Sequence, residues 1–171
     1  FWSVHRDEKR IALDLKSPQA IEIVHKLIAD ADILVENFRP GVMGRLGLGY
    51  GKLHKINPKL IYCSISSYGQ NNSFSQRPGH DVNLQAETGV MHISRTAEGV
   101  PQMPGSLLSD FMSAMIAVIS ILSAMHERER TSKGKHLDEG LVVGADGGVA
   151  NIVVYLRTAK PKVHPDYANA G

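Results

Sequence analysis

The sequence predicts an α/β fold with parallel strands, and two observations support this prediction. Short apolar, strand-like segments occur at residues 10–15, 32–36 and 60–65. Segments with helical character separate them, at residues 18–29 and 51–56. This alternating order is typical of a parallel sheet whose strands are joined by right-handed crossovers. With 171 residues the chain is long enough to bury one sizeable core, so we expect one domain.

The first helix has clear local signals. Ser17 is a favoured N-cap residue, and Pro18 is favoured in the first turn of a helix. Val24 and Ile28 recur at helical spacing on one face. These signals predict a helix from Pro18 to about Ala29 that packs on the sheet.

The regular alternation ends at a polar, turn-rich segment. Residues 68–79 (YGQNNSFSQRPG) predict a loop, and residues 81–91 have a mixed pattern that allows a helix. Residues 111–125 are apolar and uncharged but fall short of the roughly 18 residues that a membrane span needs. We therefore expect a helix buried in the core, beginning near Ser109 or Asp110.

The last part of the chain predicts further strand-like structure. Residues 136–139 have a strand-like pattern, and residues 141–156 form another apolar stretch. Residues 160–171 predict an extended, exposed tail.

Charge and composition narrow the classes of function. The net charge is +2 and the basic residues are dispersed, so neither a nucleic-acid surface nor a membrane anchor is expected. A pI near 8.7 suits an anionic ligand. Cys63 is the only cysteine, which excludes an internal disulfide and favours a reducing compartment, the cytoplasm or an organelle matrix.

Three common kinds of site find no support. The glycines of residues 44–51 lack the spacing of a dinucleotide-binding loop. Ser64, Ser66 and Ser67 lie at a strand end without the nucleophile elbow of a serine hydrolase. The histidines show no zinc-ligand spacing, so no metal is expected.

Two residues have more informative positions. His80 lies in the turn Arg77-Pro-Gly-His-Asp81, where a titratable side chain can reach a ligand. Asp110 precedes the long apolar helix and, by local sequence alone, is an N-cap residue. Burial beside that helix would also make its carboxyl group a usable acid or nucleophile.

Seven motifs carry a family resemblance, which extends from residue 6 to about residue 145. They are residues 9–16 (KRIALDLK), 31–43 (ADILVENFRPGVM), 46–50 (LGLGY), 57–62 (NPKLIY), 77–81 (RPGHD), 107–111 (LLSDF) and 128–135 (RERTSKGK). Together and in this order they resemble the class III CoA-transferase (CaiB/BaiF) family, and most closely its α-methylacyl-CoA racemase subgroup.

The resemblance implies a parallel, doubly wound, Rossmann-like α/β domain that is incomplete here. Residues 1–159 would form part of the large CoA-binding domain, and residues 160–171 an extended tail or linker toward a small domain. The substrate would be a coenzyme A thioester, with no covalently bound cofactor. The full-length protein would be an interlocked homodimer, and activity of the isolated fragment is doubtful because part of the CoA surface lies elsewhere.

The resemblance also implies a set of functional residues. His80 and Asp110 would be the catalytic pair. The implied CoA-binding residues are Leu13, Asp14, Leu15, Lys16, Asn37, Phe38, Arg39, Arg45, Gly79 and Asp81. The three cations of this set suit phosphate groups, because charge-assisted hydrogen bonds to phosphate are strong.

Two chemistries share this implied scaffold. In the racemases the histidine and the aspartate exchange the α-proton of a 2-methylacyl-CoA, and in the transferases the aspartate attacks the thioester. Transferases more often have tyrosine or another residue in place of His80, so this chain favours the racemase. Residues 111–115 depart from the glycine run that usually follows the racemase aspartate; Met112 and Met115 there are expected in the core, or else along a channel for the acyl chain. A non-catalytic fragment or binding module remains the alternative of another class.

Overall fold

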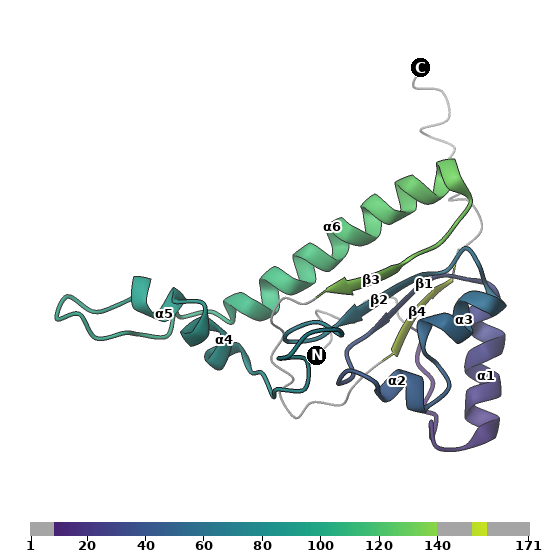
Figure 1. The fold of residues 1–171 in the computed structure, drawn as a ribbon, viewed down its shortest axis with the longest axis horizontal. Helices are drawn as coiled ribbons and strands as arrows, with labels where there is room; N and C mark the ends of the chain where they lie inside the picture. The colour runs from purple at the N-terminus through teal and green to yellow at the C-terminus, as the bar shows by residue number, and fades with distance from the viewer. Residues whose placement is uncertain (1–8, 140–151, 157–171) are drawn as a thin grey trace.

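The computed structural model describes residues 9–139 and 152–156 (Figure 1). Its elements are α1 (Pro18–Ala29), β1 (Ala31–Glu36), α2 (Val42–Arg45), α3 (Tyr50–Ile56), β2 (Ile61–Ile65), α4 (Asp81–Glu87), α5 (Val90–Ile93), α6 (Leu108–Thr131), β3 (His136–Glu139) and β4 (Ile152–Leu156). The predicted boundary near residue 159 and the tail lie outside the described residues, as does most of the apolar stretch 141–156.

One sheet with strand order β3-β2-β1-β4 forms the centre. β1 pairs in parallel with β2, and β2 pairs in parallel with β3. β4 pairs antiparallel with β1 and closes the other edge. The predicted incomplete, parallel α/β architecture is therefore confirmed, with one antiparallel edge strand added.

The strand expected at residues 10–15 is absent, and that prediction was wrong. Residues 9–14 have no regular secondary structure, and a turn begins at Leu15. A parallel strand that precedes α1 would lie beside β1. That edge of β1 is paired with β4 instead, so Leu13 and Leu15 pack on the core without joining the sheet, and Ile11 is exposed.

Helix α1 begins and ends where the local signals predict. Pro18 occupies its first turn, and Val24 and Ile28 are buried against the sheet. The Ser17 hydroxyl does not cap the helix and donates to the Gln19 side chain at 2.7 Å instead. The core between α1, α3 and the sheet consists of Val24, Ile28, Ala31, Leu34, Met43, Leu48, Leu53, Leu60 and Tyr62.

Helices cover both faces of the sheet (Figure 1). α1 packs on β1 and α3 at one face, whereas α6 packs on β2 and β3 at the other. Helices α4 and α5 extend beyond the amino-terminal end of α6. The arrangement is that of a doubly wound domain.

The prediction that α6 is a core helix was wrong for the described part of the chain. Its buried residues are small, and most of its large apolar side chains are exposed: Phe111 is 66% exposed and Ile119 is 60% exposed. Met112 and Met115 are exposed too and are not core residues. The helix is long and apolar enough to cross a membrane by length and composition, contrary to the shorter estimate from residues 111–125. This is weak evidence by itself, because core helices of soluble proteins meet the same criterion.

The carboxyl-terminal end of α6 is fastened to the sheet by polar contacts. The Arg128 guanidinium donates to the Asp32 carboxylate at 2.8 Å and to the backbone carbonyl groups of Asp32 and Lys59, each at 3.1 Å. Gly134 then passes so close to Leu60 that a Cβ atom would lie 2.0 Å from its carbonyl oxygen. Only glycine fits there, and this close passage leads the chain into β3.

Candidate active site

The candidate site lies where parallel strands β1 and β2 end side by side. Residues 37–40 follow β1, and residues 66–67 follow β2. Ligands of open α/β sheets bind beyond the carboxyl ends of the strands, where loops can present side chains. Loop residues 75–80 complete a small open pocket of about 50 Å³. Its lining is Asn37, Phe38, Arg39, Pro40, Ile65, Ser66, Ser67, Ser75, Gln76, Arg77, Pro78, Gly79 and His80.

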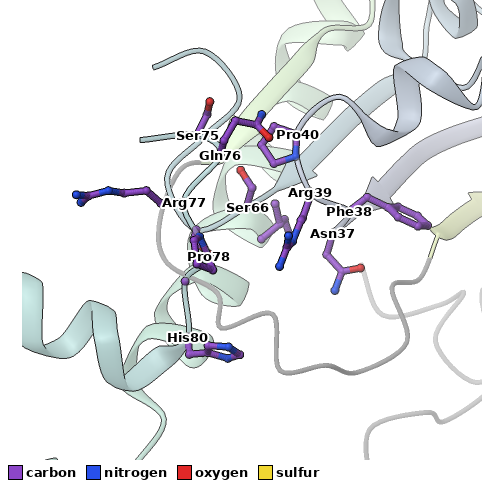
Figure 2. Close-up of a pocket in the computed structure, with 13 residues that line it drawn as sticks. Asn37, Phe38, Arg39, Pro40, Ser66, Ser75, Gln76, Arg77, Pro78 and His80 are labelled. Carbon is purple, nitrogen blue, oxygen red and sulfur yellow. The ribbon is translucent and has the colours of Figure 1, made fainter. Parts of the chain in front are cut away.

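A buried carboxyl group fixes the turn after β1, whose residues 37–40 line the pocket. Glu36, the last residue of β1, is 3% exposed, and its Oε2 accepts a hydrogen bond from the Phe38 peptide N–H at 2.9 Å. Burial raises the pKa of Glu36, against the opposing effect of hydrogen bonds from Ser64 and the Phe38 N–H. The contact turns the chain directly after β1, so that Arg39 faces the pocket (Figure 2).

The loop after β2 is held by side chains of other elements. The Gln70 N–H donates to the Asp138 carboxylate of β3 at 3.0 Å. The Tyr68 hydroxyl donates to Glu87 at the end of α4, also at 3.0 Å. Arg77 lies over the Phe74 ring, 4.8 Å from its centre, and points away from the pocket (Figure 2). The loop predicted at residues 68–79 is therefore tied to both the sheet and α4.

Gly79 allows the turn before His80 to approach the strand end. A Cβ atom at Gly79 would lie 2.4 Å from Ser67 Oγ and 2.5 Å from Ser67 Cβ, so any other residue would force the two segments apart. His80 follows at the N-cap position of α4 and is exposed at the rim of the pocket. Figure 2 shows its imidazole on the same side of the pocket as the guanidinium of Arg39.

Asp110 lies near this turn although thirty positions separate it from His80. It is half-buried in the first turn of α6. Its peptide N–H donates to Asp81 Oδ1 at 3.3 Å, and the Ser109 N–H donates to the same oxygen at 2.7 Å. Asp110 is thus not the N-cap that local sequence suggests, because Leu107 holds that position and Asp81 supplies the acceptor.

The remaining predicted CoA-binding residues lie outside the pocket lining. Leu13 and Leu15 pack against the core beneath the sheet. The Asp14 carboxylate accepts from the Lys16 N–H at 3.0 Å, which closes a tight turn before α1. Arg45 ends α2, where its guanidinium lies beside Gly41 of the turn after β1.

Sequence reasoning did not select Ser66 as a ligand contact. Ser66 is 9% exposed, lines the pocket, and its hydroxyl has no hydrogen-bond partner among the described residues. Its position directly after a strand was the one available signal. Ser64, by contrast, is 2% exposed, does not line the pocket, and has its hydroxyl 2.9 Å from His136 Nε2.

Within residues 9–139 and 152–156, no group of three or more His, Cys, Asp or Glu side chains is arranged to hold a metal ion.

Comparison with known proteins identifies the family. Residues 1–168 match the profile of CoA-transferase family III. The chain belongs to this family. The family acts on CoA thioesters, and the pocket described above contains the Asn37-Phe38-Arg39 and Gly79-His80 segments that the resemblance singled out.

Similar proteins include both transferases and racemases. The chain is 40% identical over 142 residues to the succinyl-CoA:glutarate CoA-transferase of Mus musculus, a match that covers 83% of this chain and 33% of that protein. It is 39% identical over 141 residues to the α-methylacyl-CoA racemase of Homo sapiens, covering 81% of this chain and 37% of that protein. The chain thus spans about a third of the length of these relatives.

A solved structure supports the fold. A CaiB/BaiF family protein from Brucella suis superposes with a TM-score of 0.73 at 31% identity, covering 91% of this chain and 44% of that one. Because the identities to the transferase and to the racemase are nearly equal, the family is established and the choice between the two reactions is not.

Proposed function

We propose that the protein containing this chain is a racemase or epimerase of 2-methylacyl-CoA thioesters, with His80 and Asp110 as its two bases. One observation carries the proposal. A titratable histidine stands at the rim of the strand-end pocket, and the next residue, Asp81, is hydrogen-bonded to the backbone of Asp110. Two groups able to exchange protons are thereby held in neighbouring segments.

The reaction needs an acid and a base on opposite faces of one carbon. The thioester carbonyl group acidifies the α-proton, and one side chain removes it while the carbonyl oxygen takes up the negative charge. The other side chain then returns a proton to the opposite face, which inverts the configuration. After one turnover the base carries the proton that it removed and the acid has lost its own. A turnover in the reverse direction restores both side chains.

Cations on the neighbouring loops suit the CoA portion of the substrate. Arg39 lines the pocket, and Arg45 lies beside the turn that follows it. Lys16 lies in the turn before α1. Guanidinium and ammonium groups form strong hydrogen bonds with phosphate, so alanine variants of these residues should weaken CoA binding and reduce its salt dependence.

A CoA-transferase is the second candidate, favoured by the 40% identity to a succinyl-CoA:glutarate CoA-transferase. Asp110 would then attack the thioester carbonyl carbon, forming an acyl-aspartyl anhydride and releasing the CoA thiolate. The thiolate would next attack the aspartyl carbonyl carbon of the anhydride, which releases the first carboxylate and forms an aspartyl-CoA thioester. An acceptor carboxylate would displace the thiolate to form a second anhydride, and attack of the thiolate on the acceptor's acyl carbon would give the new acyl-CoA and regenerate Asp110. His80 would have no obligatory proton transfer in this reaction.

The deciding experiment follows deuterium at the α-carbon. The full-length protein is incubated in heavy water with each stereoisomer of a 2-methylacyl-CoA, and exchange is compared with acyl transfer to added carboxylic acids. The racemase proposal expects exchange that His80→Ala slows for one stereoisomer and Asp110→Asn slows for the other. Transfer without α-exchange in the unaltered protein would replace it with the transferase.

Absence of both reactions would favour the non-catalytic alternative.

We further propose that the full-length protein is a homodimer located in the cytoplasm or an organelle matrix, and that the exposed face of α6 is covered within that assembly. The molecular mass of the full-length protein in solution tests the dimer directly.

A further inference from the structure

Asp81 is a buried carboxylate for which neither proposed reaction has a chemical step. It is 3% exposed although it lies next to the exposed His80. Oδ1 accepts the N–H groups of Ser109 and Asp110 at 2.7 and 3.3 Å, and Oδ2 accepts the Gln85 side-chain amide. Both carboxylate oxygens of Asp81 therefore accept hydrogen bonds from other groups of the protein.

The two backbone donors are those that a helix leaves without an internal partner. α6 begins at Leu108, so Ser109 and Asp110 are its second and third residues. An N-cap side chain normally accepts these N–H groups, but Leu107 at the N-cap position has no acceptor. Asp81 provides the acceptor from α4, and its negative charge also suits the positive end of the helix dipole.

The contact connects the two halves of the reactive pair. Asp81 is covalently joined to His80, and its carboxylate is hydrogen-bonded to the N–H of Asp110. Gln85, 1% exposed, strengthens the connection, since its amide also donates to the Ser106 carbonyl oxygen at 3.2 Å in the segment that leads into α6. The start of α4 and the start of α6 are therefore fixed to one another by one buried group.

We propose that Asp81 is a positioning residue: its carboxylate caps α6 from α4 and so fixes the Asp110 side chain relative to His80. This inference rests on the proposed function for the roles of His80 and Asp110. The burial of Asp81 and its two backbone donors argue against a direct contact with the phosphate groups of CoA, which are negatively charged themselves.

The inference is tested by comparing Asp81→Ala with Asp81→Asn in the full-length protein. Alanine removes the acceptor, and the start of α6 can then shift relative to His80. A displacement of about 1 Å between reacting groups can cost on the order of 100-fold in rate. We expect kcat to fall about 10- to 100-fold with KM changed less than about 3-fold. Asparagine keeps one oxygen acceptor, so Asp81→Asn should recover most of the lost kcat.

Asn57→Ala is the matched control. The Asn57 amide donates to the carbonyl oxygens of Ile28 and Ala31 at 3.0 and 2.7 Å, at the opposite end of the sheet from the pocket. This variant also removes a side-chain contact at a helix end, but it should leave kcat per folded molecule unchanged. An equal fall of kcat in Asn57→Ala and Asp81→Ala would mean that Asp81 has only a general structural role.

A second measurement needs no turnover. Hydrogen exchange at the amides of residues 109 and 110 should quicken at least about 10-fold in Asp81→Ala but not in Asn57→Ala, because the donors lose their acceptor. If Asp81→Ala does not fold, Gln85→Leu removes the supporting contacts to Asp81 Oδ2 and to the Ser106 carbonyl oxygen, and it should lower kcat by a smaller factor. If the Asp81 and Gln85 variants change neither the amide hydrogen exchange at residues 109 and 110 nor kcat, the inference is overturned, while the proposed reaction is unaffected. If the unaltered protein does not exchange the α-proton, the proposed racemase reaction is overturned. Slow hydrogen exchange at the amides of residues 109 and 110 would still support the capping of α6 by Asp81.

Discussion

The two faces of the sheet are built in opposite ways. On the side of α1 and α3, large side chains such as Leu34 and Leu53 are fully buried. On the side of α6, the fully buried residues of the helix are small, such as Ser113 and Ala117, while Phe111 and most of its large apolar side chains are exposed. Small residues let a helix lie close to a sheet, but they remove little apolar area from water. We therefore expect the α1 face to contribute most to the stability of this chain, whereas nothing among the described residues covers the outward side of α6.

The largest expected effect is a cavity on the α1 face. Leu34 is 0% exposed at the centre of β1, and its replacement by alanine leaves a void among well-packed neighbours. Leu34→Ala should lower the free energy of unfolding by about 2–5 kcal/mol. Denaturant titration of the variant and the unaltered chain measures the difference. A loss below about 1 kcal/mol would mean that this face is not the stabilising one.

The next effect concerns the polar contacts that fasten α6. Arg128→Met removes the guanidinium group that donates to the Asp32 carboxylate and to the backbone carbonyl groups of Asp32 and Lys59. The half-buried carboxylate and the two carbonyl groups then lack this donor. We expect a loss of about 1–3 kcal/mol in the free energy of unfolding. Arg130→Met, on an exposed position of the same helix, is the control and should change it by less than about 0.5 kcal/mol. Equal effects of the two variants would show that the Arg128 contacts do not fasten the helix.

A smaller, pH-dependent effect is expected from Glu36 at the end of β1. Burial raises the pKa of its carboxyl group above the ordinary value of 4.5, so the folded protein binds this proton more readily than the unfolded chain does. The resulting contribution to stability is present below pH 4.5 and is lost as the pH rises through the folded-state pKa. Denaturant titrations from pH 4 to pH 8 should therefore show the unaltered protein losing stability relative to Glu36→Gln as the pH rises. A constant difference between the two proteins across this range would contradict the assignment.

The smallest effect should come from the outward face of α6. Ile119 is 60% exposed, so Ile119→Ala removes few contacts and should change the stability of the isolated chain by less than about 0.5 kcal/mol. The same substitution in the full-length protein should cost more if that face is covered there. Equal small effects in both would show that the face stays exposed to solvent.

Local signals predicted what is locally determined. Pro18 and the periodic spacing of Val24 and Ile28 gave helix α1 its bounds, because these signals act within a few residues. The strand at residues 10–15 failed since a strand also needs a free neighbouring edge, and β4 takes it. The apolar composition of α6 predicted burial but contains no information on which element provides the cover.

The site was predictable to a different extent. Arg39 and His80 were found through the family motifs, and the structure brings both into one pocket. The capping of α6 by Asp81 could not be predicted from sequence, because donor and acceptor are 28 and 29 positions apart. Whether the side chains of His80 and Asp110 reach one substrate atom stays a prediction. For Ser66 the only sequence signal was its position after a strand, since the lack of a hydrogen-bond partner among the described residues becomes visible only in the folded pocket.

The single cysteine can report when the sheet opens, because its thiol is buried in β2. Cys63 lies in the middle of β2 with 0% exposure, and burial, with smaller contributions from Glu139 and Glu36, raises the pKa of its thiol to about 12. Thiolate is the form that reacts with alkylating reagents, so the folded sheet should be inert to them near neutral pH. Labelling can then proceed only through molecules in which β2 has separated from its neighbours. The rate at which one thiol per chain becomes labelled therefore counts the openings of the sheet, with no introduced probe.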